Sequence, residues 1–123
     1  MRIDYDLCRQ ILIDVANAPT PTVESNYSFE YEGISQAKID YNIHKLVEEG
    51  FLTGLDASSK TGLYDIQEIE LTVAGDKYLQ KVENANSWQM IKAFLSDHAV
   101  AITFQAIETV AKYVCAKPQG SIL

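Results

Sequence analysis

One amphipathic segment, residues 35–49, constrains the fold of this chain more than any other part. Ile39, Ile43 and Leu46 fall within about 60° of one another when this segment is drawn as a helix. Gly50 stands where a left-handed residue commonly ends a helix, and two large apolar residues follow it directly. We therefore expect one helix with a buried stripe, after which the chain turns back into a hydrophobic core.

Hydrophobic periodicity and turn residues predict four other helices and three short strands around this segment. The helices are expected over residues 4–17, from Thr72, from Asn86 or Ser87, and from Thr103. The strands are expected over residues 27–31, 51–56 and 64–71, with a polar turn joining the last two as a hairpin. The sequence thus predicts an α+β fold with a small antiparallel sheet of three short strands.

Two phrases of the sequence resemble parts of a winged helix-turn-helix. Residues 39–52 resemble the end of a recognition helix that runs into the first strand of the wing, and residues 71–79 resemble the "L-T-x-x-G-x-x-[FY]-L" start of the following helix. The predicted element order agrees, although residues 19–33 offer a loop and a strand where a typical member has a separate second helix. In residues 4–12, 41–52 and 71–79, in the Ser87-Trp88 step and in the amphipathic C-terminal helix, and so over almost its whole length, the chain also resembles an uncharacterised family of small proteins found mainly in bacteria and their prophages.

The resemblance implies a winged-helix core and additional C-terminal helices. We expect residues 1–86 to form the core and residues 87–123 to form a helical extension that packs on it, as one compact domain. For function the resemblance implies little, because one fold serves many activities.

The charge of the chain limits how it can bind nucleic acid. The net charge is −7, and residues 1–86 hold 7 basic and 15 acidic side chains, whereas residues 87–123 hold 3 and 2. This balance argues against electrostatic binding over a wide surface, so any DNA contact must come from a local patch. No apolar run approaches the roughly 20 residues of a membrane span, and the acidic N-terminus differs from a signal peptide. We expect a cytoplasmic protein.

The sequence holds no pattern that is typical of an enzyme or of a cofactor or metal site. His44 and His98 have no acid or cysteine at metal-ligand spacing, and the glycines form no phosphate loop. Cys8 and Cys115 lie near opposite ends of the chain, and we expect two reduced, buried thiols, with a disulfide between the terminal helices as the alternative.

The exposed face of the 35–49 helix is the predicted binding site. Lysine can contact phosphate or guanine, and asparagine and glutamine can pair with adenine edges. The candidate residues on this helix and its flanks are Gln36, Lys38, Tyr41, Asn42, His44 and Lys45. On the wing turn the candidates are Ser58, Ser59 and Lys60. Acidic neighbours on the helix would repel phosphates, so the face is only weakly basic.

Two functions remain open at this point. The first is a winged-helix protein that binds double-stranded DNA and regulates transcription, related to phage or prophage. The second is a protein-interaction module that uses the same scaffold without DNA. An acidic surface with exposed aromatic residues would suit a protein partner. The aromatic residues considered are Tyr5, Tyr27, Tyr31, Tyr41 and Trp88, of which Trp88 has burial beneath the neighbouring helices as its alternative.

The C-terminal residues predict a homodimer. Residues 99–116 are nearly continuous in apolar side chains, which is more than a terminal helix of a small monomer usually needs. We expect a symmetric dimer whose interface includes residues 100–116. The alternative is that helices of the same chain cover this surface.

Overall fold

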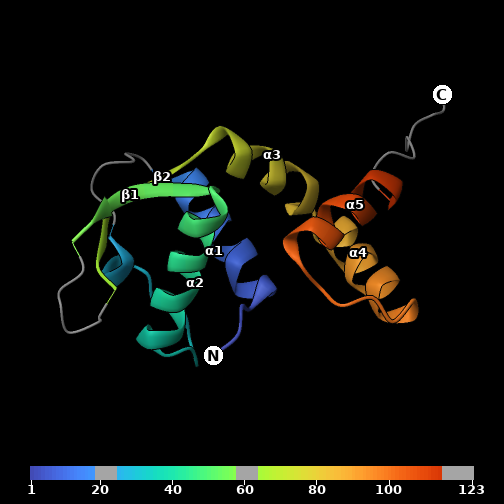
Figure 1. The fold of residues 1–123 in the computed structure, drawn as a ribbon, viewed down its shortest axis with the longest axis horizontal. Helices are drawn as coiled ribbons and strands as arrows, with labels where there is room; N and C mark the ends of the chain where they lie inside the picture. The colour runs from blue at the N-terminus through green and yellow to red at the C-terminus, as the bar shows by residue number, and fades with distance from the viewer. Residues whose placement is uncertain (19–24, 58–63, 115–123) are drawn as a thin grey trace. The chain divides into compact units, whose positions relative to one another are not determined.

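The computed structural model describes residues 1–18, 25–57 and 64–114. Its contacts divide the chain into two compact units, Met1–Lys77 and Tyr78–Leu123 (Figure 1). The division falls inside helix α3, Val73–Val82, and so lies before the boundary at residue 86 that the sequence suggested. Each unit has its own core. The packing of one unit on the other stays a prediction.

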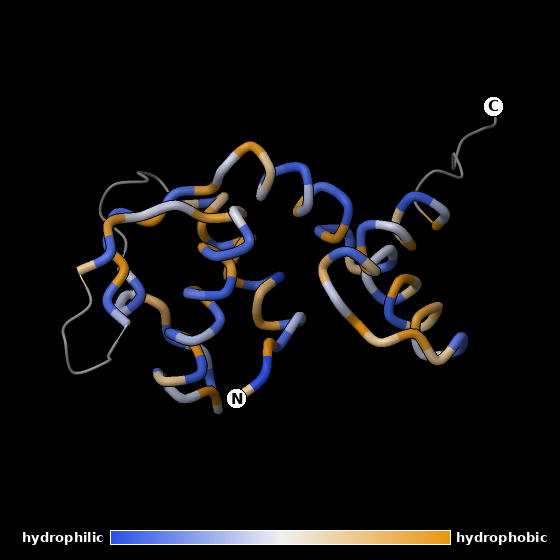
Figure 2. Tube along the Cα trace, viewed as in Figure 1, coloured by the Kyte–Doolittle hydropathy of each residue, from blue (hydrophilic) through white to orange (hydrophobic). Residues whose placement is uncertain are grey.

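Helices α1, Tyr5–Asn17, and α2, Gln36–Glu49, form the centre of the first unit. Hydrophobic and hydrophilic residues are interspersed along both helices, as their amphipathic patterns predict (Figure 2). Asp4 caps α1 by accepting a hydrogen bond from the backbone N–H of Leu7. Ser35 caps α2, and Gly50 ends it in the left-handed conformation, with φ 85°. Both predicted helices are therefore confirmed, and each begins one residue after its expected first residue, which forms the cap.

Strands β1, Leu52–Asp56, and β2, Ile66–Leu71, pair antiparallel as the predicted hairpin. Their register shifts between Thr53 and Leu55, and Glu68 has φ 54° at the bulge. A regular strand would point Ile66 and Ile69 to opposite faces, but the extra residue between them turns both into the core. The bulge therefore explains why the apolar residues of this strand do not alternate.

The prediction of a strand over residues 27–31 is wrong. A short 3₁₀ helix, η1, Asn26–Ser28, lies there instead, and a single antiparallel bridge joins Ser25 to Gln67. The Ser25 and Ser28 side chains and backbones hydrogen-bond to each other and close the turn locally. Such local bonds compete with strand pairing. The described residues consequently form a sheet of two strands, not three.

The second unit is helical. It contains the end of α3 with α4, Ala85–Asp97, and α5, Phe104–Val114. The cap of α4 is Asn84, which accepts from the N–H of Ser87, so the predicted start at Asn86 or Ser87 lies inside the helix. Thr103 caps α5 as predicted, by accepting from the N–H of Ala106.

Most apolar side chains of α5 are buried within this unit. The side chains of Phe104, Ile107, Val110 and Ala111 are buried, and α5 packs on α4. The Phe104 ring also meets Tyr78 of α3 edge-on, at 5.4 Å between ring centres. Trp88 is buried in α4, so it is not an exposed aromatic residue. Part of the apolar surface that motivated the dimer prediction thus has a partner inside the chain.

Candidate functional site

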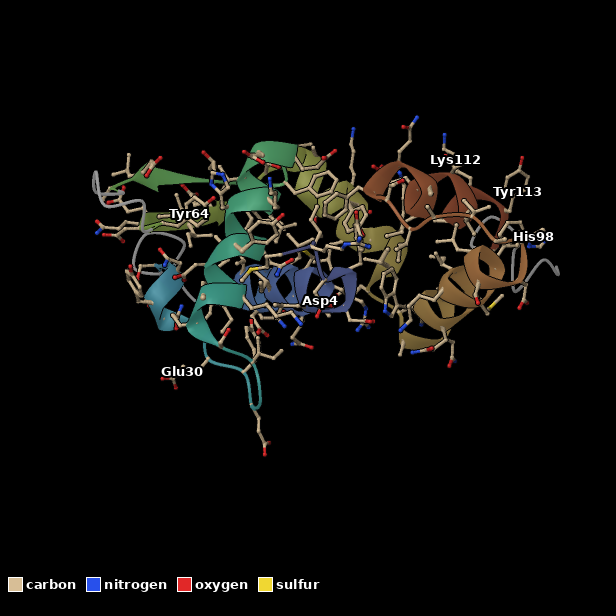
Figure 3. The ribbon with its side chains drawn as sticks, turned by 60° about the horizontal axis from the view of Figure 1, so that its bottom comes forward. Asp4, Glu30, Tyr64, His98, Lys112 and Tyr113 are labelled. Carbon is tan, nitrogen blue, oxygen red and sulfur yellow. The ribbon has the colours of Figure 1, made fainter. Side chains whose placement is uncertain are left out.

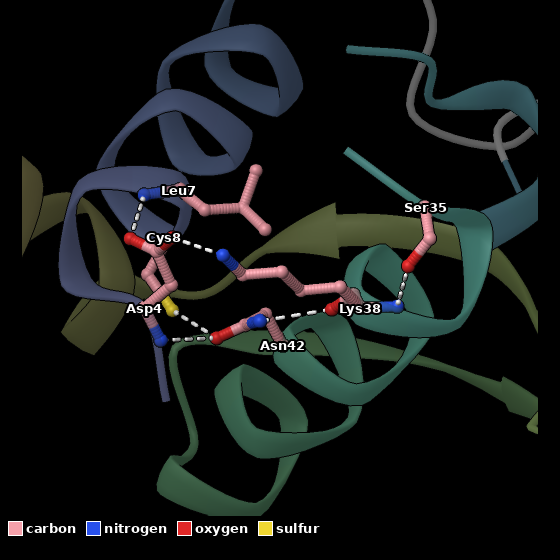
Figure 4. Close-up of polar contacts among 6 residues, drawn as sticks. All are labelled: Asp4, Leu7, Cys8, Ser35, Lys38 and Asn42. Carbon is pink, nitrogen blue, oxygen red and sulfur yellow. Dashed lines mark hydrogen bonds and ion pairs between the residues drawn. The ribbon is translucent and has the colours of Figure 1, made fainter. Parts of the chain in front are cut away.

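Asn42 belongs to the core rather than to the exposed face of α2. Its side chain is fully buried, because position 42 lies about 40° from Leu46 and about 60° from Ile39 around the helix, at the edge of the buried stripe. Its Oδ1 accepts hydrogen bonds from the N–H of Asp4 at 2.8 Å and from the thiol of Cys8 at 3.5 Å, and its Nδ2 donates to the carbonyl of Lys38 at 2.8 Å (Figure 4). Asn42 therefore attaches the start of α1 to α2, and its predicted place among the binding residues is wrong.

Lys38 is held by the same junction. Its Nζ lies 2.8 Å from the Asp4 carboxylate, as Figure 4 shows. Burial acts to raise the pKa of Asp4, but the hydrogen bonds from Lys38 and from the Leu7 backbone outweigh it and lower the pKa below its ordinary 3.8. The charge of Lys38 is thus already balanced within the chain.

His44 and Lys45 both meet Glu48 on the outer face of α2. The Lys45 Nζ lies 3.0 Å from one Glu48 oxygen, and the His44 Nε2 lies 3.0 Å from the other. The hydrogen bond with Lys45 is the main cause that lowers the pKa of Glu48, and it likewise raises the pKa of Lys45. One ring face of His44 stacks on Tyr64, which Figure 3 labels beside α2, with 4.1 Å between ring centres.

Gln36 points into a polar network rather than away from the protein. Its Nε2 donates to the carbonyl of Asn26 and to Oδ1 of Asp40, both at 2.8 Å. Asn26 is fully buried, and its Nδ2 donates to the same Asp40 oxygen at 2.8 Å and to the carbonyl of Tyr64 at 3.3 Å. The Asn26 Oδ1 accepts from the N–H of Ile66 at 2.6 Å. Asn26 thereby joins η1, α2 and the start of β2.

A pocket of about 480 Å³ opens beside this network. Three tyrosines line it: Tyr27 from η1, Tyr41 from α2 and Tyr64 just before β2. The other lining residues are Met1, Gln36, Ala37 and Asp40. The Tyr27 hydroxyl donates to the Tyr64 carbonyl at 3.2 Å, which ties two of the rings together. The Nζ of Lys45 lies 5.3 Å from the centre of the Tyr41 ring, so a cation already rests on one of the three.

The structure places the predicted site residues in three different surroundings. Gln36 and Tyr41 line the pocket, Lys38, His44 and Lys45 lie on α2 with carboxylate partners, and Asn42 is buried. Ser58, Ser59 and Lys60 lie outside the described residues. Sequence reasoning missed Asn26, Asp40 and Tyr64. Nothing in the sequence indicates that residues 26, 40 and 64 meet, because only the fold brings them together.

A second, apolar hollow of about 490 Å³ lies in the helical unit. Its lining residues are Met90, Phe94, Tyr113 and Val114. The His98 ring stacks on Phe94 with 4.1 Å between ring centres, and Figure 3 labels His98 and Tyr113 at the same end of the α4–α5 pair. No charged residue lines this hollow, so it offers shape and apolar contact but little chemical selectivity.

The described residues give no sign of a metal centre or of a membrane span. They hold no group of three or more His, Cys, Asp or Glu residues that could bind a metal ion. Across the same residues, no helix is long and apolar enough to cross a membrane. Cys8 is a buried free thiol whose pKa burial raises well above its ordinary value, while Cys115 lies outside the described part of the chain.

These features define a small mixed α+β protein, with five α-helices and a two-stranded antiparallel sheet among the described residues. Residues 2–101 match the model of an uncharacterised family described as "Hypothetical protein (DUF2513)", and the chain belongs to this family. No curated protein and no solved structure matches the chain.

Proposed function

We propose that the Met1–Lys77 unit is a winged helix whose α2 surface recognises another protein. The order α1, α2, hairpin, α3 supports the winged-helix assignment, with η1 in the place of the usual second helix. The bridge between Ser25 and Gln67 stands where a third strand would pair with the hairpin. In this arrangement α2 corresponds to the recognition helix and residues 52–71 to the wing.

The charge distribution on α2 favours a protein partner over DNA. Each lysine and histidine of this helix has a carboxylate oxygen within 3.0 Å: Lys38 has Asp4, and His44 and Lys45 share Glu48. Binding to DNA depends on cations that neutralise several phosphates. A phosphate would have to compete with these carboxylates, in a unit that has 14 acidic and 6 basic side chains. The helix is therefore poorly suited to a phosphate backbone.

The pocket beside α2 has the composition of a protein-binding surface. Tyrosine is enriched at interfaces because it buries a large apolar ring at little cost in conformational entropy and keeps a polar hydroxyl. Tyr27 is 49% exposed, although it is fixed through its hydroxyl to Tyr64. Rings that are held in place before binding lose less freedom when a partner arrives.

The test is a parallel selection with the full chain. The protein is offered a random peptide library at about 150 mM salt and a random duplex DNA library at about 50 mM salt. We expect enriched peptides whose affinity falls at least about tenfold in Tyr41→Ala, as for an interface hot spot. Tyr113→Ala is the matched control, because Tyr113 is also exposed but lies on α5 in the other unit. Both variants should keep the melting temperature of the parent.

Binding to duplex DNA as a transcription regulator is the rival function, and the position of α2 before the hairpin favours it. It would appear as retained duplexes whose affinity falls steeply with salt and is weakened by Lys45→Ala. That result, together with no enriched peptide, would overturn the proposed function.

A further inference from the structure

The pocket formed by Tyr27, Tyr41 and Tyr64 has one carboxylate among its lining residues. We propose that it binds a side-chain ammonium group, that is, a lysine of the protein partner. This inference rests on the proposed function and names the group that α2 and its neighbours would recognise. Neither the resemblance to a winged helix nor the family implies such a site.

The three rings supply the first part of the argument. A cation above the face of a tyrosine is attracted by the negative charge of the π system, and the attraction grows as the cation loses water. Tyr41 already shows this preference, since the Lys45 Nζ lies 5.3 Å from its ring centre. Three tyrosines from three different segments line the one pocket, so a cation that enters it can contact more than one ring.

Asp40 supplies the second part. Its Oδ1 accepts hydrogen bonds from both Asn26 and Gln36 at 2.8 Å, which occupies this oxygen. Among the described residues no donor reaches Oδ2, so one oxygen of a carboxylate in the pocket wall remains to accept a hydrogen bond from a ligand. The buried Asn26 and the helix hold Asp40 in place, so the acceptor is fixed before a ligand binds.

The single available oxygen also distinguishes between the two basic side chains. Arginine gains most from a carboxylate when both oxygens accept its two parallel N–H groups. At Asp40 one oxygen is already used, and a bidentate pair is therefore blocked unless the Asn26 and Gln36 bonds break. An ammonium group is a compact point charge that needs one acceptor and can rest among the rings. The site thus favours lysine over arginine.

The experiment is a titration of the ¹⁵N-labelled full chain, followed by amide chemical shifts. The probes are N-acetyl-lysine amide, its trimethylated form, N-acetyl-arginine amide and the neutral N-acetyl-norleucine amide. We expect the lysine probe to shift the amides of residues 36–41. The trimethylated probe keeps the charge but has no N–H to donate to Asp40, so it should shift them less, and the norleucine probe should leave them unchanged up to about 50 mM. Tyr41→Ala and Asp40→Asn should each lower the affinity for the lysine probe about tenfold. This is the loss expected when a desolvated cation–π contact or a charge-assisted hydrogen bond is removed.

Asp40→Asn keeps an oxygen for the Asn26 and Gln36 donors, so it removes the charge with little change to the network. Glu30→Gln is its matched control, because Glu30 is an exposed carboxylate that projects away from the protein in Figure 3 and does not line this pocket. Equal binding of the norleucine probe, or tighter binding of the arginine probe, would overturn the inference.

The two proposals fail in different ways. Peptides that depend on Tyr41 but contain no lysine would refute the ammonium site and leave protein recognition standing. Duplex DNA as the selected ligand would refute protein recognition, whereas the titration with lysine probes would still report on the pocket.

Discussion

Asn42→Ala tests whether this side chain is structural, as its burial indicates, or part of an exposed binding face. The substitution removes two hydrogen bonds of 2.8 Å and one thiol contact of 3.5 Å, and it leaves a small cavity between α1 and α2. The part-buried Asp4 N–H and the buried Cys8 thiol lose their acceptor, and a buried donor left without a partner costs about 1–3 kcal/mol. We expect a total loss of about 3 kcal/mol in the free energy of unfolding of the Met1–Lys77 unit.

For a unit of this size, such a loss lowers the melting temperature by roughly 15 °C. The measurement is thermal unfolding by circular dichroism, with hydrogen exchange of the α1 and α2 amides to report on this unit alone. Lys45→Ala is the control on the same helix, because Lys45 lies on the outer face and its removal should leave the melting temperature near that of the parent. If the melting temperature of Asn42→Ala falls by less than about 4 °C, the structural role of Asn42 is refuted, and Asn42 becomes a candidate for the exposed binding face again.

Three further predictions follow from the same contacts. Gly75→Ala should destabilise the first unit by more than about 3 kcal/mol in urea unfolding, because a Cβ there would overlap the Phe51 carbonyl oxygen; stability like that of the parent would contradict this close approach. Since the pKa of Asp4 is lowered in the folded state, its contribution is present above pH 3.8 and is lost as the pH falls below it. Asp4→Asn should accordingly be less stable than the parent at pH 7 and converge with it near pH 2, and parallel curves would argue against the ion pair. Light scattering should give a mass near 13.7 kDa, because α5 buries its apolar stripe within the chain; twice that mass would support the dimer predicted through residues 100–116.

Local patterns in the sequence predicted the helices well. Asp4, Thr72 and Thr103 each accept a hydrogen bond from a backbone N–H in the first turn of the next helix, and Gly50 ends α2, as expected. These signals act over three or four residues, so they can be read without the fold. At residues 27–31, however, the alternating aromatic residues predicted a strand, and this prediction is wrong. There the hydrogen bonds between Ser25 and Ser28, which are only three residues apart, favoured a turn.

The site was only partly predictable, because it depends on distant residues. Gln36 and Tyr41 could be placed on an exposed helix from spacing alone. The residues that complete the pocket, Tyr27 and Tyr64, are 37 positions apart and meet through the hydrogen bond between the Tyr27 hydroxyl and the Tyr64 carbonyl. Asn42 could not be assigned correctly either, because a polar residue on a buried stripe is stable only if the facing helix supplies donors, as Asp4 does.

By itself, the sequence determined the helix that is central to this protein: its stripe of Ile39, Ile43 and Leu46, its glycine stop and the hairpin that follows. Hydrophobic periodicity and capping are properties of neighbouring residues, which is why they can be read from the chain alone. Only the tertiary structure decided what the outer face of that helix can bind. Lys38 and Lys45 pair with the carboxylates of Asp4 and Glu48. Tyr41 lines a pocket together with one tyrosine from η1 and one that lies just before β2. Charge pairing and pocket shape arise between residues that only folding brings within a few ångströms of one another.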